Sequence, residues 1–222
     1  MGMSFIIRSY QPKERETIRW ICCETGFMGE PIEAFFLGRE IFADLWSRYY
    51  LDYEPESCFV AEVEGRVVGY LLGCLDTSRY EQIFNQKINP GLFRQCLREG
   101  FFFKRKNLQY VYRVIRSRWR GEFKVPMGWI KAEYPAHLHI NIAPPEYRGR
   151  GIGKALMLRY LDYLREHKIP GVHLGTTSRN KRALGLYYHL GFKDLFRGAL
   201  TCYEHILSEP LELIYLGLKL EG

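Results

Sequence analysis

The 222-residue sequence lacks any long run of apolar residues. Its longest apolar stretches, such as residues 67–75, are interrupted by glycine and fall far short of the roughly 20 residues that a membrane-crossing helix needs. The N-terminus also lacks the basic start, apolar run and small-residue cleavage site of a secretion signal. We therefore expect no spanning segment, no membrane partner and a cytoplasmic location.

Disulfide and metal-binding patterns are missing as well. The cysteines form no C-x-x-C pair and no paired spacing with histidine, which argues against a zinc site and against a disulfide framework. Several lie in apolar surroundings, where cysteine behaves as a small hydrophobic residue. We expect no metal, and we expect these cysteines to be reduced and mostly buried: Cys22, Cys23, Cys58, Cys74, Cys96 and Cys202.

Positive charge is concentrated in one segment. With 47% hydrophobic and 26% charged residues the composition is that of a globular protein, and its net charge is +7. Residues 94–124 hold ten basic residues against two acidic ones, interleaved with aromatic residues. Such a segment is usually a solvated helical face, but it could also meet nucleic acid, an acidic protein or cofactor phosphates. Because no nucleic-acid motif accompanies the charge, we do not expect nucleic acid as a partner.

Hydrophobic periodicity predicts a chain of mixed helices and strands. A hairpin is expected where Glu64-Gly65-Arg66 joins two β-rich runs, and the basic segment after it is expected to be a helical insertion. Without repeats or linkers, we expect one domain over residues 1–222 with an insertion at about 77–135. The predicted strands are 5–8, 58–63, 67–75, 137–143, 172–177, 192–196 and 211–220, and the predicted helices are 13–23, 41–50, 152–167 and 181–190.

A glycine-rich turn, Arg148-Gly149-Arg150-Gly151-Ile152-Gly153-Lys154, lies between a predicted strand and a predicted helix. Open backbone N–H groups and the positive end of a helix make such a turn an anion site. The phosphate loop of nucleotide hydrolases is excluded because only three residues separate Gly149 from Gly153 and alanine follows Lys154. The dinucleotide fingerprint fails too, because the spacing is G-x-G-x-G.

The pattern R-x-x-G-x-G in this position resembles the pyrophosphate loop of the GCN5-related N-acetyltransferases (GNAT). Residues 180–192, N-K-R-A-L-G-L-Y-Y-H-L-G-F, are similar to the N-x-x-A-x-x-x-Y-x-x-x-G-F helix of the same family. The resemblance implies an α/β (α+β) fold with a mixed, mostly antiparallel sheet flanked by helices, here with the basic helical insertion before the fourth strand. It also implies transfer of an acetyl group from acetyl-CoA to a primary amine, in a small molecule or a peptide, by direct attack.

The resemblance also assigns residues. The pyrophosphate is expected at the glycine turn and the pantetheine beside Ile142, whose backbone N–H would polarise the thioester carbonyl. Tyr187 is expected to protonate the leaving sulfur, although periodicity alone would make it a core tyrosine. Asn180 is a helix N-cap, a cofactor ligand or both. The implied cofactor-binding residues are Asn141, Ile142, Ala143, Arg148, Gly149, Arg150, Gly151, Ile152, Gly153, Lys154, Asn180 and Tyr187.

A base is also useful, because an amine must lose a proton to attack a thioester. Period-two alternation places His137 and His139 on one face of a strand together with Asn141, and that face is expected to look into a cleft. Histidine titrates near neutral pH, and the A-H-L-H stretch resembles a strand of arylalkylamine acetyltransferases in which such a pair acts in proton transfer. The alternative is two half-buried histidines that only satisfy hydrogen bonds, with Glu133 as the reserve base.

A second resemblance leaves a different function open. Residues 58–80 are similar to the acetyltransferase-like domain of animal O-GlcNAc hydrolases and its free-standing bacterial relatives. The fold can persist without catalysis, so a non-catalytic acetyl-CoA-binding module acting through a partner is the alternative function. The family places acceptor recognition at residues 26–36 and in parts of 75–131, where Glu30 and Glu33 could attract a cationic amine. Relatives that form dimers make a homodimer one option.

Overall fold

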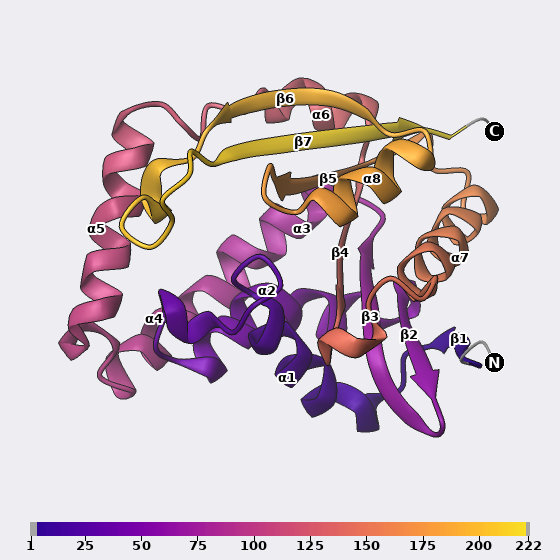
Figure 1. Ribbon diagram of the computed structural model, residues 1–222, viewed down its shortest axis with the longest axis horizontal. Helices are drawn as coiled ribbons and strands as arrows, with labels where there is room; N and C mark the ends of the chain where they lie inside the picture. The colour runs from indigo at the N-terminus through magenta and orange to yellow at the C-terminus, as the bar shows by residue number, and fades with distance from the viewer. Residues whose placement is uncertain (1–3, 221–222) are drawn as a thin grey trace.

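A single seven-stranded sheet forms the centre of the computed structural model, which describes residues 4–220 (Figure 1). Residues 1–3 and 221–222, the outer ends of the expected domain, lie outside this range. The strand order is β1-β2-β3-β4-β5-β7-β6, and every neighbouring pair is antiparallel except β4 with β5. The strands are β1 (Ile6–Ser9), β2 (Cys58–Val63), β3 (Arg66–Cys74), β4 (Ala136–Ile142), β5 (Gly171–Thr177), β6 (Lys193–Ala199) and β7 (Glu212–Lys219).

Helices cover both faces of the sheet. α1 and α2 pack on one face against β3 and β4, and α7 packs on the other face against β2, β3 and β4. No helix within residues 4–220 combines the length and the apolar character that a membrane crossing requires. The helices are α1 (Arg15–Thr25), α2 (Arg39–Tyr53), α3 (Thr77–Ile83), α4 (Asn89–Arg98), α5 (Arg105–Trp119), α6 (Met127–Glu133), α7 (Ile152–Glu166) and α8 (Lys181–His189).

Each face of the sheet has its own hydrophobic core. On the α7 side, Met157, Tyr160, Leu161 and Leu164 are buried, as their spacing predicts. On the α1 side, four cysteines pack among aromatic and aliphatic residues of α1, α2, β2 and β3. All six cysteines are free, and only Cys96 is partly exposed, so the predicted burial of most of these thiols is confirmed.

The segment between β3 and β4 is helical, as predicted, and contains α3 to α6. Its longest helix, α5, lies at the edge of the molecule in Figure 1 and contacts the connection between β6 and β7. There the Glu122 carboxylate accepts the Thr201 N–H at 2.8 Å, and the Ser117 and Thr201 hydroxyls lie 3.1 Å apart. The rings of Tyr110 and Tyr203 extend this contact toward Phe35 of the α1–α2 loop.

Several predicted boundaries differ from the structure by one to three residues, and two of them have clear local reasons. α1 begins two residues after the predicted start, because residues 12–14 form a 3-10 turn and the Glu14 carboxylate accepts the Gln11 N–H at 2.9 Å. β6 continues three residues beyond the predicted strand, because its ladder with β7 runs on until Ala199 pairs with Glu212. The predicted hairpin is confirmed, with Glu64 and Gly65 at positive φ in its turn.

Candidate active site

The parallel strands β4 and β5 separate part-way along their length. They pair only at Ala136 with Val172 and at His137 with His173, although β4 continues to Ile142 and β5 to Thr177. The other neighbour of β4, β3, remains paired with it as far as Ile142. A gap therefore opens between the C-terminal halves of β4 and β5.

Ile142 turns its backbone toward this gap. Residues of an antiparallel pair alternate between positions that exchange hydrogen bonds and positions that do not. Because the Ala143 N–H donates to the Val68 carbonyl at 3.0 Å, the N–H and C=O of the preceding residue, Ile142, point away from β3. The Ile142 carbonyl is taken by Arg148 Nε at 2.8 Å, which leaves its N–H facing the space beside β5.

The glycine turn leads from β4 into α7. Gly149 and Gly151 have φ values of 77° and 88°, a left-handed region that L side chains with a Cβ rarely adopt. The first hydrogen bond donated into α7 runs from Ala155 N–H to the Gly151 carbonyl at 3.0 Å. Within residues 4–220, the N–H groups of residues 149–154 have no acceptor. These donors and the N-terminal end of α7 make a site for phosphate.

Arg148 holds the turn against the α1–α2 loop. Its guanidinium donates from Nε to the Ile142 carbonyl and from an Nη atom to the Gly29 carbonyl, each at 2.8 Å. One side chain thus joins the end of β4 to the loop that follows α1. Two of its five N–H donors are thus engaged in the protein, so Arg148 supports the shape of the turn and also lines the cavity as a cation.

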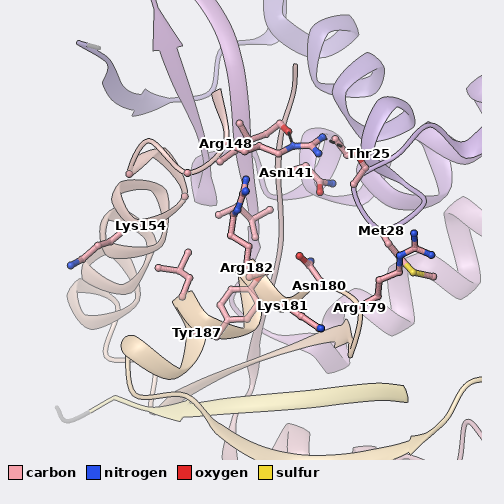
Figure 2. A pocket seen from close by; sticks show the side chains of 18 residues that line it. Thr25, Met28, Asn141, Arg148, Lys154, Arg179, Asn180, Lys181, Arg182 and Tyr187 are labelled. Carbon is pink, nitrogen blue, oxygen red and sulfur yellow. Dashed lines mark hydrogen bonds between the residues drawn. The ribbon is translucent and has the colours of Figure 1, made fainter. Parts of the chain in front are cut away.

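A cavity of about 530 Å³ lies where the gap, the glycine turn and α8 meet (Figure 2). Five cationic residues line it and, among its described lining residues, none is acidic. The Arg182 guanidinium lies close to Gly149, whereas Lys154 is directed away and has its Nζ 3.3 Å from His189 Nε2. The cationic residues are Arg148, Lys154, Arg179, Lys181 and Arg182. The cavity therefore favours an anionic ligand that extends from the turn into the gap.

Tyr187 lines the cavity from α8. The side chain is 6% exposed, and it packs against Phe192 with the ring centroids 5.8 Å apart. Burial raises the pKa of the hydroxyl, because an ionised phenol would lose hydration there. Tyr187 consequently keeps its hydroxyl protonated at physiological pH.

His137 lies deeper along β4 and outside the cavity lining. Its Nδ1 is 2.8 Å from the Thr77 hydroxyl and its Nε2 is 2.9 Å from the Tyr50 hydroxyl. The pKa of His137 is lowered to about 3, mainly because burial disfavours the charged ring and to a smaller extent because His173 and His139 lie nearby. Both ring nitrogens of His137 are engaged within the protein. This arrangement fits the alternative interpretation, in which the histidine only satisfies hydrogen bonds and does not act as a base.

His139 lies one step closer to the cavity on the same face of β4. Its ring stacks on Trp46 of α2 at 5.6 Å, and its Nδ1 is 3.3 Å from the Tyr70 hydroxyl. Its Nε2 is 3.3 Å from the amide nitrogen of Asn141, which lines the cavity. Burial lowers the pKa of His139 to about 4, so the ring is neutral at pH 7.

Comparison with known proteins decides the family. The model of the acetyltransferase (GNAT) family matches residues 27–192, a span that includes the split strands, the glycine turn and α8. The chain belongs to the GNAT acetyltransferase family. Its mostly antiparallel seven-stranded sheet flanked by helices is that of the GNAT fold, as the resemblance of the two sequence motifs implied.

Individual GNAT relatives resemble different extents of the chain. A mycothiol acetyltransferase of Nocardiopsis dassonvillei is 46% identical over 79 residues, which are 36% of this chain and 24% of that protein. The chain thus spans about a quarter of the length of that curated relative. The crystal structure of SsHAT is 29% identical with a TM-score of 0.72, covering 99% of this chain and 100% of that one.

One GNAT neighbour carries its ligand. The structure of yncA from Salmonella typhimurium with its cofactor acetyl-CoA has a TM-score of 0.57 and covers 99% of this chain and 95% of that chain. At 14% identity, this likeness shows the fold alone.

The lowered histidine pKa gives the GNAT chain an expected pH dependence of stability. An unfolded histidine binds a proton below about pH 6.5, whereas folded His137 binds one only near pH 3. Unfolding therefore takes up a proton between these values, and the free energy of unfolding should fall as pH decreases from 7 to 4. We expect the His137→Gln variant to lose less stability over this interval in urea titrations. The exposed His189→Gln should keep the parent slope, and a parent slope in His137→Gln would contradict the account.

The GNAT fold brings together most, but not all, of the sequence-predicted residues. Asn141, Ile142, Asn180, Tyr187 and most of the glycine turn line the cavity. Asn180 is at the N-cap of α8, but its side chain does not cap the helix. Glu133 pairs with Lys219 away from the cavity lining. Five other predicted residues lie outside the lining, of which Ala143 and Ile152 are buried: His137, His139, Ala143, Arg150 and Ile152.

Several residues at the site were not predicted. Trp46, Tyr70 and Thr77 contact the histidines from α2, β3 and α3, and no local pattern in the sequence links them to β4. Arg179 and Lys181 line the cavity beside Asn180. Their position between a strand and a helix could have predicted them as ligand-binding residues.

Proposed function

We propose that the chain catalyses transfer of an acetyl group from acetyl-CoA to a primary amine. The proposal rests mainly on the continuity of the cavity. One cavity is lined by glycines of the turn with open N–H groups, by Ile142 at the gap and by Tyr187. A diphosphate at one end and a thioester at the other match that order of features.

The residues present fit acetyl-CoA. The unpaired N–H groups of the glycine turn, with Arg182 beside Gly149, would hold the pyrophosphate. The pantetheine would lie along Asn141 and Ile142 on β4 and along Asn180 at the N-cap of α8. The Ile142 N–H would donate to the thioester oxygen, a contribution that grows as that oxygen gains negative charge.

Proton transfers are assigned to Tyr187 and His139. Bound acetyl-CoA would supply a thioester carbonyl for the amine to attack and a sulfur that leaves. Tyr187 donates a proton toward that sulfur, because its raised pKa keeps the hydroxyl protonated. Neutral His139 would accept the proton of the amine through one water, because its ring lies outside the cavity lining and contacts the lining residue Asn141.

His139 is preferred to His137 for a geometric reason. His139 contacts Asn141, a lining residue, whereas His137 contacts Thr77 and Tyr50, neither of which lines the cavity. We assign His137 a structural role within β4, where it joins the strand to Thr77 and Tyr50.

The test is acetyl transfer with purified protein. Acetyl-CoA is incubated with a panel of aliphatic amines, aryl-alkylamines and peptides that have free N-termini, while free thiol and the acetylated product are followed together. We expect stoichiometric thiol and amide with at least one acceptor. Binding of acetyl-CoA with no amide from any acceptor class would favour a non-catalytic module, and absence of binding would remove the donor assignment.

A further inference from the structure

Helices α4 and α5, with the short helix η5 (Phe101–Phe103) between them, expose a dense set of large apolar side chains. Phe103 is 92% exposed and Trp119 is 87% exposed, at opposite ends of α5. Residues on this surface make up most of the exposed large apolar side chains of residues 4–220. We call it the α4–α5 face, and its apolar members are Phe93, Leu97, Phe102, Phe103, Leu108, Tyr112, Ile115 and Trp119.

The apolar members are ordered by helix geometry. On α5 the sequence intervals of four, three and four residues from Leu108 to Trp119 place them in one stripe, while Asn107 and Ser117 are buried on another side of the helix. On α4, Phe93 and Leu97 are one turn apart, and the Phe93 ring lies 6.4 Å from that of Phe102. Because η5 contacts both helices, the two parts belong to one surface.

Cationic side chains accompany the stripe. α5 contains no acidic residue, and on α4 two exposed arginines, Arg94 and Arg98, alternate with Phe93 and Leu97. Within the described part of the chain, the arginines of α5 form no ion pair, so their charge is not neutralised by the protein. These arginines are Arg105, Arg113, Arg116 and Arg118.

We propose that the α4–α5 face docks on the anionic surface of a lipid bilayer. Apolar and aromatic side chains beside unpaired arginines are the composition of helices that lie in a membrane interface, with rings at headgroup level and cations on lipid phosphates. α5 forms an outer edge of the molecule (Figure 1), and the apolar side chains of its stripe are exposed to solvent. The proposal departs from the expectation of no membrane partner. That expectation rested on the lack of a spanning segment, and docking in the interface requires none.

Charge and shape argue against other occupants. A second copy would bring two unneutralised basic faces together, which like-charge repulsion opposes. Nucleic acid would use the arginines but not Leu97, Leu108 and Ile115, since aliphatic side chains cannot stack on bases as aromatic rings do. Peptide helices usually dock in grooves, and the stripe lies on the outside of a helix.

The test is vesicle binding by the intact chain. Vesicles of phosphatidylcholine alone and vesicles with one-third phosphatidylglycerol are sedimented with the protein, and the bound fraction is measured. We expect binding to the anionic vesicles only, weakening as salt is raised. Phe103→Ser with Trp119→Ser, and separately Arg116→Glu with Arg118→Glu, should each lower the partition coefficient at least tenfold.

Matched variants control for folding and for general charge. Trp20→Ser with Leu158→Ser removes exposed apolar residues from α1 and α7, and Arg66→Glu with Lys193→Glu reverses exposed charges elsewhere. Both controls should bind vesicles like the parent, and all variants should bind acetyl-CoA like the parent. Equal binding to neutral vesicles, retention of binding in the α4–α5 variants, or binding to polyglutamate or single-stranded DNA without binding to anionic vesicles would overturn the proposal.

Discussion

Replacing Tyr187 with phenylalanine is expected to lower kcat for acetyl transfer about 100-fold, at the lower end of what a positioned acid contributes. The variant keeps the ring that packs against Phe192 and removes only the hydroxyl that lines the cavity. The Michaelis constant for acetyl-CoA should change little, because the proton is needed only as the sulfur leaves. Steady-state thiol release with a responsive amine measures both constants.

The adjacent tyrosine supplies the control. Tyr188 is exposed and its hydroxyl donates to Asp194 at 2.8 Å, away from the cavity lining. Tyr188→Phe should keep the parent kcat. If Tyr187→Phe turned over as fast as Tyr188→Phe, the assignment of Tyr187 as proton donor would be wrong.

Replacing Gly151 with valine is expected to weaken acetyl-CoA binding at least about thirtyfold. At a φ of 88°, a β-branched side chain costs about 2 kcal/mol or more, so the turn changes conformation and its N–H groups lose their common direction. Space is not the reason, because a Cβ at Gly151 would meet nothing within 4 Å. Equilibrium dialysis with labelled acetyl-CoA measures the loss.

Gly185 supplies the control, because its helical backbone conformation does not require glycine. It lies inside α8, and a Cβ there would also meet nothing within 4 Å. Gly185→Ala should leave the affinity for acetyl-CoA unchanged and raise stability by up to about 1 kcal/mol, because alanine favours a helix. Parent affinity in Gly151→Val would show that the conformation of the turn does not set binding.

The parts of this molecule that were predicted are those whose signals are local. The glycine turn and α8 are defined by spacings within a dozen residues, and both lie where the spacing indicates. The β2–β3 hairpin is likewise fixed by a glycine turn between two β-rich runs. Such elements combine backbone preference and apolar periodicity in one segment of sequence.

The remaining features depend on residues that are distant in sequence. Separation of β4 from β5 after His137 is set by the whole sheet, so no window around either strand reports it. The stack of Trp46 on His139 joins α2 to β4, and the hydrogen bonds that occupy His137 come from α2 and α3. Strand alternation placed both histidines on one face correctly, but it could not show that their environments differ.

Calorimetric titration of the parent protein with acetyl-CoA tests whether the glycine turn and the cavity beside it hold this donor. We expect saturable binding of one acetyl-CoA per chain. We also expect a rise in the thermal unfolding midpoint, with about 2.7 kcal/mol of added stability when free ligand is one hundred times Kd. Absence of both binding heat and thermal stabilisation at millimolar acetyl-CoA would contradict the assignment of the glycine turn and the cavity beside it.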